Sequence, residues 1–313
     1  MSPHTVEVQD LSKTYPGGVE AVRGIDFDVS PGEVFGLLGP NGAGKSTTVG
    51  ILTTTIAPTS GRALVAGFDV SSDPIGARQA SAVVFQEPVV DGTLSGRRNL
   101  GVHARLWSLD ASSARERVAA VVDAFGLGEV IDRPVASYSG GQRRRLEIAR
   151  ALVSEPEVLF LDEPTVGLDT RIRHELLDLL AGLRARSGMT TLLTTHYLDE
   201  AEELCDRVAI MHEGRIVAMD RPDALLARLG NELVELRIDG DVSAAVSSLR
   251  AQGIAGDDAF AVGATLLVPL RDRPGHQVAA RITELGLAVT AVTSRQPTLD
   301  DVYLQLTGAS LAA

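Results

Sequence analysis

The chain is poor in cysteine, lysine and aromatic residues, and each shortage limits what the protein can be. Its 313 residues contain a single cysteine, Cys205, so an internal disulfide is excluded and we expect this thiol to be a small core residue. Aromatic residues make up only 4% of the sequence, so the core must be built mainly from aliphatic side chains. Lysine occurs only at Lys13 and Lys45, and all other basic residues apart from the histidines are arginine.

The chain also lacks long apolar runs and a surplus of positive charge. No run approaches the roughly 20 residues that a bilayer span needs, and the first residues do not read as a signal peptide. We therefore expect a cytoplasmic protein, to which another protein must supply any membrane pore. The net charge of −12 argues against a nucleic-acid partner, and the scattered histidines show no metal-ligand spacing.

Residues 39–46 match the phosphate-loop pattern G-x-x-x-x-G-K-[ST]. They follow an apolar run at residues 34–38, so the sequence predicts a buried strand, a loop and a helix in that order. Backbone N–H groups of such a loop and the positive end of the helix dipole attract phosphate. The alternative interpretation is a glycine-rich turn in which the Lys-Ser pair occurs by chance. The residues that we expect to bind nucleotide here are Gly39, Pro40, Asn41, Gly42, Ala43, Gly44, Lys45, Ser46 and Thr47.

Two of these residues have distinct predicted roles. The compact ammonium of Lys45 adds a point charge beside the phosphates, and the hydroxyl of Ser46 can ligate Mg²⁺. A lysine at this position, in a chain that otherwise uses arginine almost everywhere, supports the interpretation.

Two carboxylates, Asp162 and Glu163, follow the apolar run at residues 158–161. We expect Asp162 to hold Mg²⁺ through water and Glu163 to orient or deprotonate the water that attacks the γ-phosphate. Paired carboxylates at a strand end could instead form a solvated turn, but this alternative is weak behind a complete phosphate loop.

Gln86 and His196 each follow a predicted strand, at residues 83–85 and 190–195. The amide of Gln86 can reach Mg²⁺ or the attacking water, and His196 can donate a hydrogen bond to the γ-phosphate. Each signal is weak by itself, because a lone glutamine is normally a surface residue and a lone histidine after a strand is more often structural.

Ser139-Gly140-Gly141-Gln142 opens an amphipathic helical pattern, for which Ser139 is a natural N-cap. Arginines at positions 143–145 oppose the helix dipole, which prefers anions in the first turn. A phosphate or carboxylates of a partner would relieve this conflict, and a solvated basic turn is the simpler alternative.

The order of predicted elements indicates an α/β domain followed by a smaller one. Strands dominate residues 1 to about 36, helices dominate about 88–155, and strands then alternate with helices, which is typical of a parallel sheet. We assign residues 1–230 to this first domain. Residues 231–313 predict the order β-α-β-β-α-β of a small α+β ferredoxin-like domain, and Thr298 with Asp301 predicts a capping-box start for a last helix.

The order of these motifs, with SGGQ between the phosphate loop and Asp162-Glu163, resembles that of the ATP-binding cassette (ABC) ATPases. This resemblance implies a P-loop cassette with an antiparallel N-terminal part and a helical subdomain. The resemblance implies an enzyme that binds ATP and Mg²⁺ and hydrolyses ATP. It also implies that Ser139, Gly140, Gly141 and Gln142 of one copy close over the ATP of a second copy, with residues 166–169 as a dimer-contacting loop. Tyr15 resembles the aromatic residue that stacks on adenine, although an exposed turn tyrosine is the alternative.

The whole chain is similar to the ATP-binding subunits of ABC-2-type exporters, particularly the daunorubicin/doxorubicin-resistance group. Residues 138–146, 159–169 and the tail at 297–304 carry this resemblance. It implies efflux of a drug-like or other hydrophobic compound through a separate transmembrane permease subunit, with the chain peripheral on the inner face of the cell membrane. The chain departs from the group at Arg98, where relatives commonly have glutamate in a segment that faces the membrane subunit.

Other functions remain as alternatives. The chain could serve another ABC-2-type system that exports lipid or polysaccharide, or an importer whose ATPase has a regulatory C-terminal domain. A soluble ABC ATPase of DNA repair or translation would usually have two cassettes, long coiled coils or zinc modules, none of which the sequence predicts. A module that binds ATP without hydrolysis would need a broken catalytic set, whereas Glu163 and His196 are both present.

Overall fold

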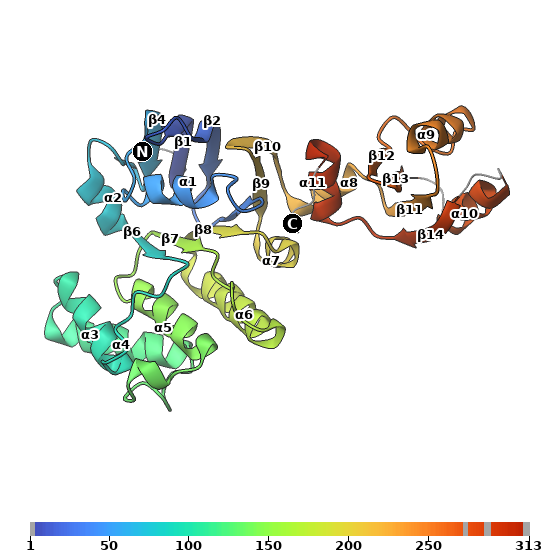
Figure 1. Ribbon diagram of the computed structural model, residues 1–313. Helices are drawn as coiled ribbons and strands as arrows, with labels where there is room; N and C mark the ends of the chain where they lie inside the picture. The colour runs from blue at the N-terminus through green and yellow to red at the C-terminus, as the bar shows by residue number, and fades with distance from the viewer. Residues whose placement is uncertain (1–3, 272–274, 285–288, 309–313) are drawn as a thin grey trace. The chain divides into compact units, whose positions relative to one another are not determined.

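A computed structural model describes residues 4–271, 275–284 and 289–308 of the chain (Figure 1). Contacts between residues divide the chain into two units, Met1–Ile216 and Val217–Ala313, which we describe separately. Among the described residues, no helix is both long enough and apolar enough to cross a bilayer.

The first unit begins with an antiparallel sheet of four strands in the spatial order β2-β1-β4-β5. Strand β1 pairs with β2 on one side and with β4 on the other, and β-bulges interrupt both pairings. This sheet is the antiparallel N-terminal part that the resemblance to ABC ATPases implies, and it extends beyond the strands expected up to about residue 36. Its strands are β1 (Val6–Thr14), β2 (Glu20–Val29), β4 (Ser60–Val65) and β5 (Phe68–Asp69).

A second sheet has the spatial order β10-β9-β3-β8-β7-β6, and its strands β9, β3, β8, β7 and β6 run parallel. All residues of β3, β7 and β8 are buried, which is typical of parallel strands covered on both faces. Because parallel strands end at the same edge, loops after β3, β6, β7 and β8 lie along one edge. The strands are β3 (Val34–Leu38), β6 (Ser81–Val84), β7 (Val158–Asp162), β8 (Thr190–Thr195), β9 (Arg207–His212) and β10 (Arg215–Asp220).

Some helices of the first unit pack on its sheets, and others pack mainly on one another. Helix α1 contacts β2, β4 and β7, whereas α3, α4 and α5 contact one another in the helical segment, drawn in green and cyan in Figure 1. Helix α5 also contacts β6 and α6. The helices are α1 (Lys45–Leu52), α2 (Pro74–Ala80), α3 (Gly96–Leu106), α4 (Ala111–Ala124), α5 (Gly140–Leu152), α6 (Thr170–Ser187) and α7 (Leu198–Leu204), with a 3₁₀ turn at Val135–Ser137.

The second unit contains an antiparallel sheet in the order β12-β13-β11-β14. With α9 and α10 in the chain order β-α-β-β-α-β, this is the ferredoxin-like arrangement that the sequence predicts. The predicted capping box between Thr298 and Asp301 is also present at the start of α11. The elements are α8 (Pro222–Ala227), β11 (Glu232–Ile238), α9 (Val242–Ala251), β12 (Phe260–Val262), β13 (Thr265–Leu270), α10 (Gly275–Glu284), β14 (Val289–Arg295) and α11 (Leu299–Thr307).

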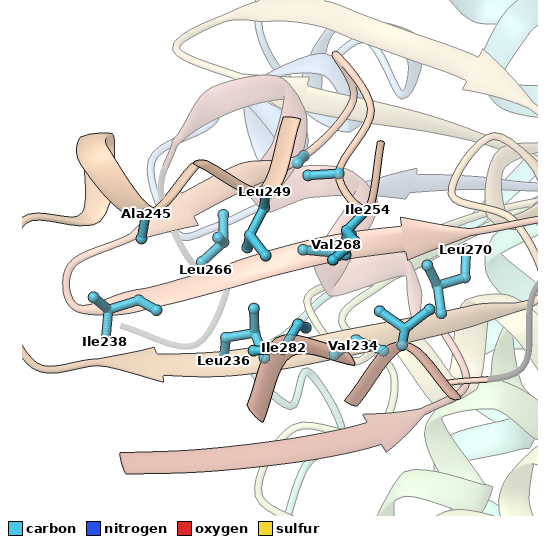
Figure 2. Packing of buried hydrophobic residues seen from close by; sticks show 13 residues of the cluster. Val234, Leu236, Ile238, Ala245, Leu249, Ile254, Leu266, Val268, Leu270 and Ile282 are labelled. Atoms are coloured by element: carbon cyan, nitrogen blue, oxygen red, sulfur yellow. The ribbon is translucent and has the colours of Figure 1, made fainter. Parts of the chain in front are cut away.

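The core of the second unit is aliphatic, as the scarcity of aromatic residues requires. Figure 2 shows alternate side chains of β11 and β13, such as Leu236 and Leu266, packed with Leu249 of α9 and Ile282 of α10. Alternation of inward side chains along a strand places these residues on one face, which the two helices cover.

The domain boundary expected near residue 230 stays a prediction. The division of the chain by contacts between residues falls earlier, within β10. Helix α8, which the sequence assigns to the first domain, contacts α11 of the second unit. Asn231, four residues after the end of α8, donates a backbone hydrogen bond to the carbonyl of Leu270 at the end of β13.

The close packing behind the central sheet generates a stability prediction at Gly36 of β3. A Cβ at this position would lie 2.8 Å from the Sγ atom of Cys205 and 3.1 Å from a methyl group of Val208. We expect Gly36→Ala to lower the free energy of unfolding by about 1–3 kcal/mol through overpacking. Urea unfolding followed by circular dichroism measures the change.

A double-mutant cycle supplies the control for this prediction. Cys205→Ala removes the buried sulfur, so the double variant should recover part of the loss that Gly36→Ala causes. If the effects of the two substitutions were simply additive, contact with Cys205 would not explain the role of Gly36.

Candidate active site

The candidate phosphate loop connects β3 to α1 and depends on three glycines. Gly42 and Gly44 have φ angles of 82° and 104°, a region that residues with a side chain rarely adopt. A Cβ on Gly39 would lie 2.4 Å from the carbonyl oxygen of Met211, and one on Gly44 would lie 2.4 Å from that of Ala21. Glycine is therefore required both by backbone conformation and by close packing of the loop on neighbouring strands.

Lys45 begins α1 and is only 4% exposed. Its ammonium donates hydrogen bonds to the carbonyl oxygens of Gly39 (2.7 Å) and Pro40 (3.1 Å). It also lies 3.3 Å from Oε1 of Glu163, which is 7% exposed. The positive charge predicted inside the phosphate loop thus lies beside the carboxylate predicted to act on water.

Ser46 and Asp162 meet across the boundary between α1 and β7. The Ser46 hydroxyl donates to Oδ1 of Asp162 at 3.1 Å, and the same oxygen accepts a 2.6 Å hydrogen bond from Thr194. Serine hydroxyls and carboxylates are oxygen ligands of the kind that Mg²⁺ prefers. Among the described residues, no group of three or more His, Cys, Asp or Glu side chains is arranged to hold a metal ion.

Glu163 has a strained backbone, with a φ angle of 46° that is unusual for a residue with a side chain. Its N–H group donates to the hydroxyl of Thr194 at 2.9 Å. Its second carboxylate oxygen lies 3.4 Å from Nδ1 of His196, which follows β8. The carboxylate therefore lies between Lys45 on one side and His196 on the other.

Buried Glu200 of α7 links the loops that follow β7 and β8. Its carboxylate accepts hydrogen bonds from the hydroxyls of Thr165 and Thr195, the latter at 2.7 Å. Burial raises the pKa of Glu200, and the two hydroxyl contacts oppose that rise. Glu200 thus holds Thr165, which lies two residues after Glu163, close to Thr195, which precedes His196.

Tyr15 and Gln86 lie at the periphery of this group. The Tyr15 hydroxyl is 3.3 Å from the Thr47 hydroxyl of α1, and the Lys13 ammonium lies 5.2 Å from the centre of the Tyr15 ring. Gln86 is exposed and lies two residues after Val84, the last residue of β6.

The predicted SGGQ motif begins α5. Ser139 and Gln142 form a capping box in which each side chain binds the other residue's backbone, so the predicted N-cap is present. Ser139 and Gly140 are exposed, whereas a Cβ on Gly141 would lie 2.5 Å from Ile172 of α6. Ser139 and Gly140 are thus open to solvent at the start of α5.

The structure brings together the side chains of five of the predicted residues and leaves those of others apart from them. The contacts above join Lys45, Ser46, Asp162, Glu163 and His196 into one group. Tyr15 contacts α1 through the hydroxyl of Thr47. Within the described part of the chain, the side chains of Ser139 and Gln142 contact their own capping box and not this group.

Sequence reasoning missed Thr194, Glu200 and the acceptors of Arg144. Thr194 pairs in register with Asp162 in the parallel sheet, a placement that the β-prone run alone does not reveal. The three arginines of α5 did give a signal, because they oppose the helix dipole. The structure shows acceptors within the same chain for two of them, since Arg144 binds backbone carbonyls and Arg145 binds Glu175.

The chain matches known proteins over nearly its whole length. The family model described as ABC transporter matches residues 22–166. The Daunorubicin/doxorubicin resistance ATP-binding protein DrrA of Streptomyces peucetius is 41% identical over 97% of this chain and 92% of its own length. The Nod factor export ATP-binding protein I of Rhizobium etli is 37% identical over 97% of this chain and 93% of its own length.

A solved structure supports the same relationship. The cbiO1 protein from Clostridium perfringens, described as part of the ABC transporter complex cbiONQ, has a TM-score of 0.67 and 29% sequence identity, and the match covers 80% of this chain and 96% of that protein. The relative from Streptomyces peucetius extends the similarity through both units. The chain belongs to the ABC transporter family, as one of its ATP-binding proteins.

Proposed function

We propose that the chain is the ATP-hydrolysing subunit of an ABC exporter that moves a drug-like or other hydrophobic compound through a separate membrane subunit. The observation that carries the hydrolytic part of the proposal is the group formed by Lys45, Glu163 and His196 at the edge of the parallel sheet. It combines a phosphate-binding cation with a buried carboxylate and an imidazole, which are the groups that phosphoryl transfer to water needs.

Residues of the chain would perform the steps as follows. The loop N–H groups and Lys45 would bind the β- and γ-phosphates of ATP, with Tyr15 against the adenine ring. Glu163 would accept a proton from the attacking water or orient it, and His196 would donate a hydrogen bond to the γ-phosphate. Thr194 holds the strained backbone of Glu163, and this restraint would fix the orientation of the Glu163 carboxylate toward the attacking water.

Ser46 and Asp162 fit a Mg²⁺ ion, because their oxygens lie 3.1 Å apart beside the phosphate loop. Bound there, Mg²⁺ would neutralise charge on the phosphate oxygens. The exposed amide of Gln86 would contribute a further oxygen.

A second copy of the chain would complete each site. The exposed start of α5 at Ser139 and Gly140 offers N–H groups and a helix dipole, which suit a γ-phosphate held by another copy. The loop at residues 166–169 would contact the partner. Two ATP molecules would then be buried in a dimer, with Gly141 and Gln142 lining the partner's nucleotide.

Export is supported by the names of the relatives rather than by the site. One relative carries resistance to daunorubicin and doxorubicin in its name, and another carries Nod factor export. A separate permease subunit would bind the compound and hold this chain at the inner face of the membrane. The segment around Arg98 in α3 is our candidate contact with that subunit.

ATP binding should depend on Lys45. Replacing Lys45 by alanine removes the fixed cation, so Mg-ATP should no longer raise the unfolding temperature. Ligand at 100 times its Kd stabilises a protein by about 2.7 kcal/mol, which a thermal-shift assay resolves. Lys13→Ala removes the only other lysine, which binds the carbonyl of Ala57 and lies near the Tyr15 ring rather than in the phosphate loop, and should keep most of the protection. Equal protection of wild type and Lys45→Ala would contradict the assignment.

Glu163→Gln should keep ATP binding and lose hydrolysis. Loss of the carboxylate should lower kcat by about 10²–10⁴-fold, the usual contribution of a general base. The variant should then hold ATP long enough for light scattering with Mg-ATP to give twice the 33.0 kDa of the chain. A variant that hydrolyses ATP at the wild-type rate, or that stays monomeric, would refute this role.

Ser139→Arg should separate ATP binding from hydrolysis. The phosphate loop is unchanged, so the affinity for ATP should match that of wild type, but the bulky cation at the start of α5 should prevent closure on the partner's nucleotide. Mixing this variant with Lys45→Ala creates heterodimers with one intact composite site, and hydrolysis should return in the mixture if the two sites act independently.

Nucleotide affinity is the control for the Ser139 experiment. If Ser139→Arg abolished ATP binding by the monomer, SGGQ would belong to the site of its own chain and the dimer mechanism would fail.

A further inference from the structure

Helix α5 carries two buried charged side chains, Arg144 and Glu147, on its inner side. They are 8% and 1% exposed and lie one helical turn apart. Buried charges are costly unless hydrogen bonds compensate them, so their partners reveal what they stabilise.

The guanidinium of Arg144 binds main-chain carbonyls at the ends of two strands. Nε donates to the carbonyl of Pro164 and Nη1 to that of Phe85, both at 2.6 Å. Nη2 lies 3.3 Å from the carbonyl oxygen of Asp162 and 3.2 Å from that of Glu163. One side chain of the helix thus contacts the loop after β7 and the last residue before Gln86.

The contact with Glu163 bears on the strained backbone of that residue. Thr194 fixes Glu163 through its N–H group, and Arg144 contacts its carbonyl oxygen. The peptide groups on both sides of a residue with a φ angle of 46° are therefore restrained. Such restraint is needed to keep a non-glycine residue in this conformation.

Glu147 anchors the other end of the loop that contains Gln86. Its Oε1 atom accepts hydrogen bonds from the N–H groups of Val89 and Val90, each at 2.9 Å. With Arg144 bound to Phe85, helix α5 holds the Gln86 loop on both sides.

Arginine suits this position better than lysine. A guanidinium has a rigid planar fork of five N–H donors, whereas an ammonium is a compact point charge with three. Burial lowers the pKa of Arg144, and the nearby carboxylates of Glu147 and Asp162 oppose that change. The group stays protonated at neutral pH, because arginine does not lose its proton in proteins.

We propose that Arg144 is a positioning residue for ATP hydrolysis, which ties α5 to the backbone around Glu163 and to the Gln86 loop. The proposal rests on the hydrolytic function assigned above. Ser139 at the start of the same helix would contact the nucleotide of the partner copy. Arg144 would therefore connect the partner's nucleotide site to Glu163 of the chain that carries Arg144. Removal of the fork should therefore impair hydrolysis and leave ATP binding by the phosphate loop intact.

The test compares Arg144→Gln, Arg144→Lys and Arg145→Gln in the full-length chain. Arg145 is a matched control, because it lies on the next position of the same helix and pairs with the partly exposed Glu175. For each variant we would measure kcat and KM for Mg-ATP, together with the affinity for a fluorescent ATP analogue and the unfolding temperature.

We expect Arg144→Gln to lower kcat by roughly 100-fold, the scale of loss when a catalytic group is misplaced by about 1 Å. KM and the affinity for the analogue should stay at wild-type values. Arg144→Lys should regain part of the lost kcat, because it keeps the charge and one or two hydrogen bonds. Arg145→Gln should stay within about fivefold of wild type, as expected for a partly exposed ion pair.

Three outcomes would overturn the inference and leave the proposed function intact. Wild-type kcat in Arg144→Gln would show that Glu163 does not need the fork. A parallel loss of ATP affinity and kcat in both Arg144 variants, or an equal loss of kcat in Arg145→Gln, would show a merely structural role. If Arg144→Gln does not fold, the same comparison is made with Arg144→Lys. A loss of kcat without a loss of ATP affinity then supports the inference, and an equal loss of both overturns it. A wild-type chain that binds but never hydrolyses ATP would instead refute the proposed function, and this inference with it.

Discussion

The buried ion pair between Lys45 and Glu163 is the interaction on which the rest of the site depends. Its atoms lie 3.3 Å apart, and neither side chain is more than 7% exposed. Removing two charges from water costs several kcal/mol for each unless they are paired and hydrogen-bonded. Two carbonyl oxygens of the phosphate loop accept hydrogen bonds from the Lys45 ammonium, and His196 lies next to the Glu163 carboxylate. The ends of β3, β7 and β8 must stay in register for this compensation to hold.

The same constraint explains why so many polar groups are buried around the strand ends. Thr194 binds both Asp162 and the backbone of Glu163, and Glu200 binds the threonines after β7 and at the end of β8. Arg144 adds donors from a helix outside the sheet. A network in which every member has a partner is rigid, whereas a partly satisfied one would be costly in a medium of low dielectric constant.

Much of the fold and part of the site could be predicted from the sequence. The phosphate loop, the buried strands before Gly39 and Asp162, the N-cap at Ser139 and the order of elements in the second unit are all local patterns, and the structure contains them. The partners of Arg144 could not be predicted, although its conflict with the helix dipole marked it as unusual. Its acceptors are backbone carbonyls up to 59 positions away along the chain, and carbonyls carry no sequence signal.

The sequence by itself determined the elements, their capping and the kinds of chemical group available, because these depend on residues within a few positions of one another. Tertiary structure decided which groups meet. Parallel pairing of β7 with β8 aligns Asp162 with Thr194, and pairing of β3 with β8 aligns Leu38 with Thr195, next to His196. Strand register is set by packing across the whole sheet, so the contacts of Glu163 with Lys45, Thr194 and His196 arise only when distant segments assemble.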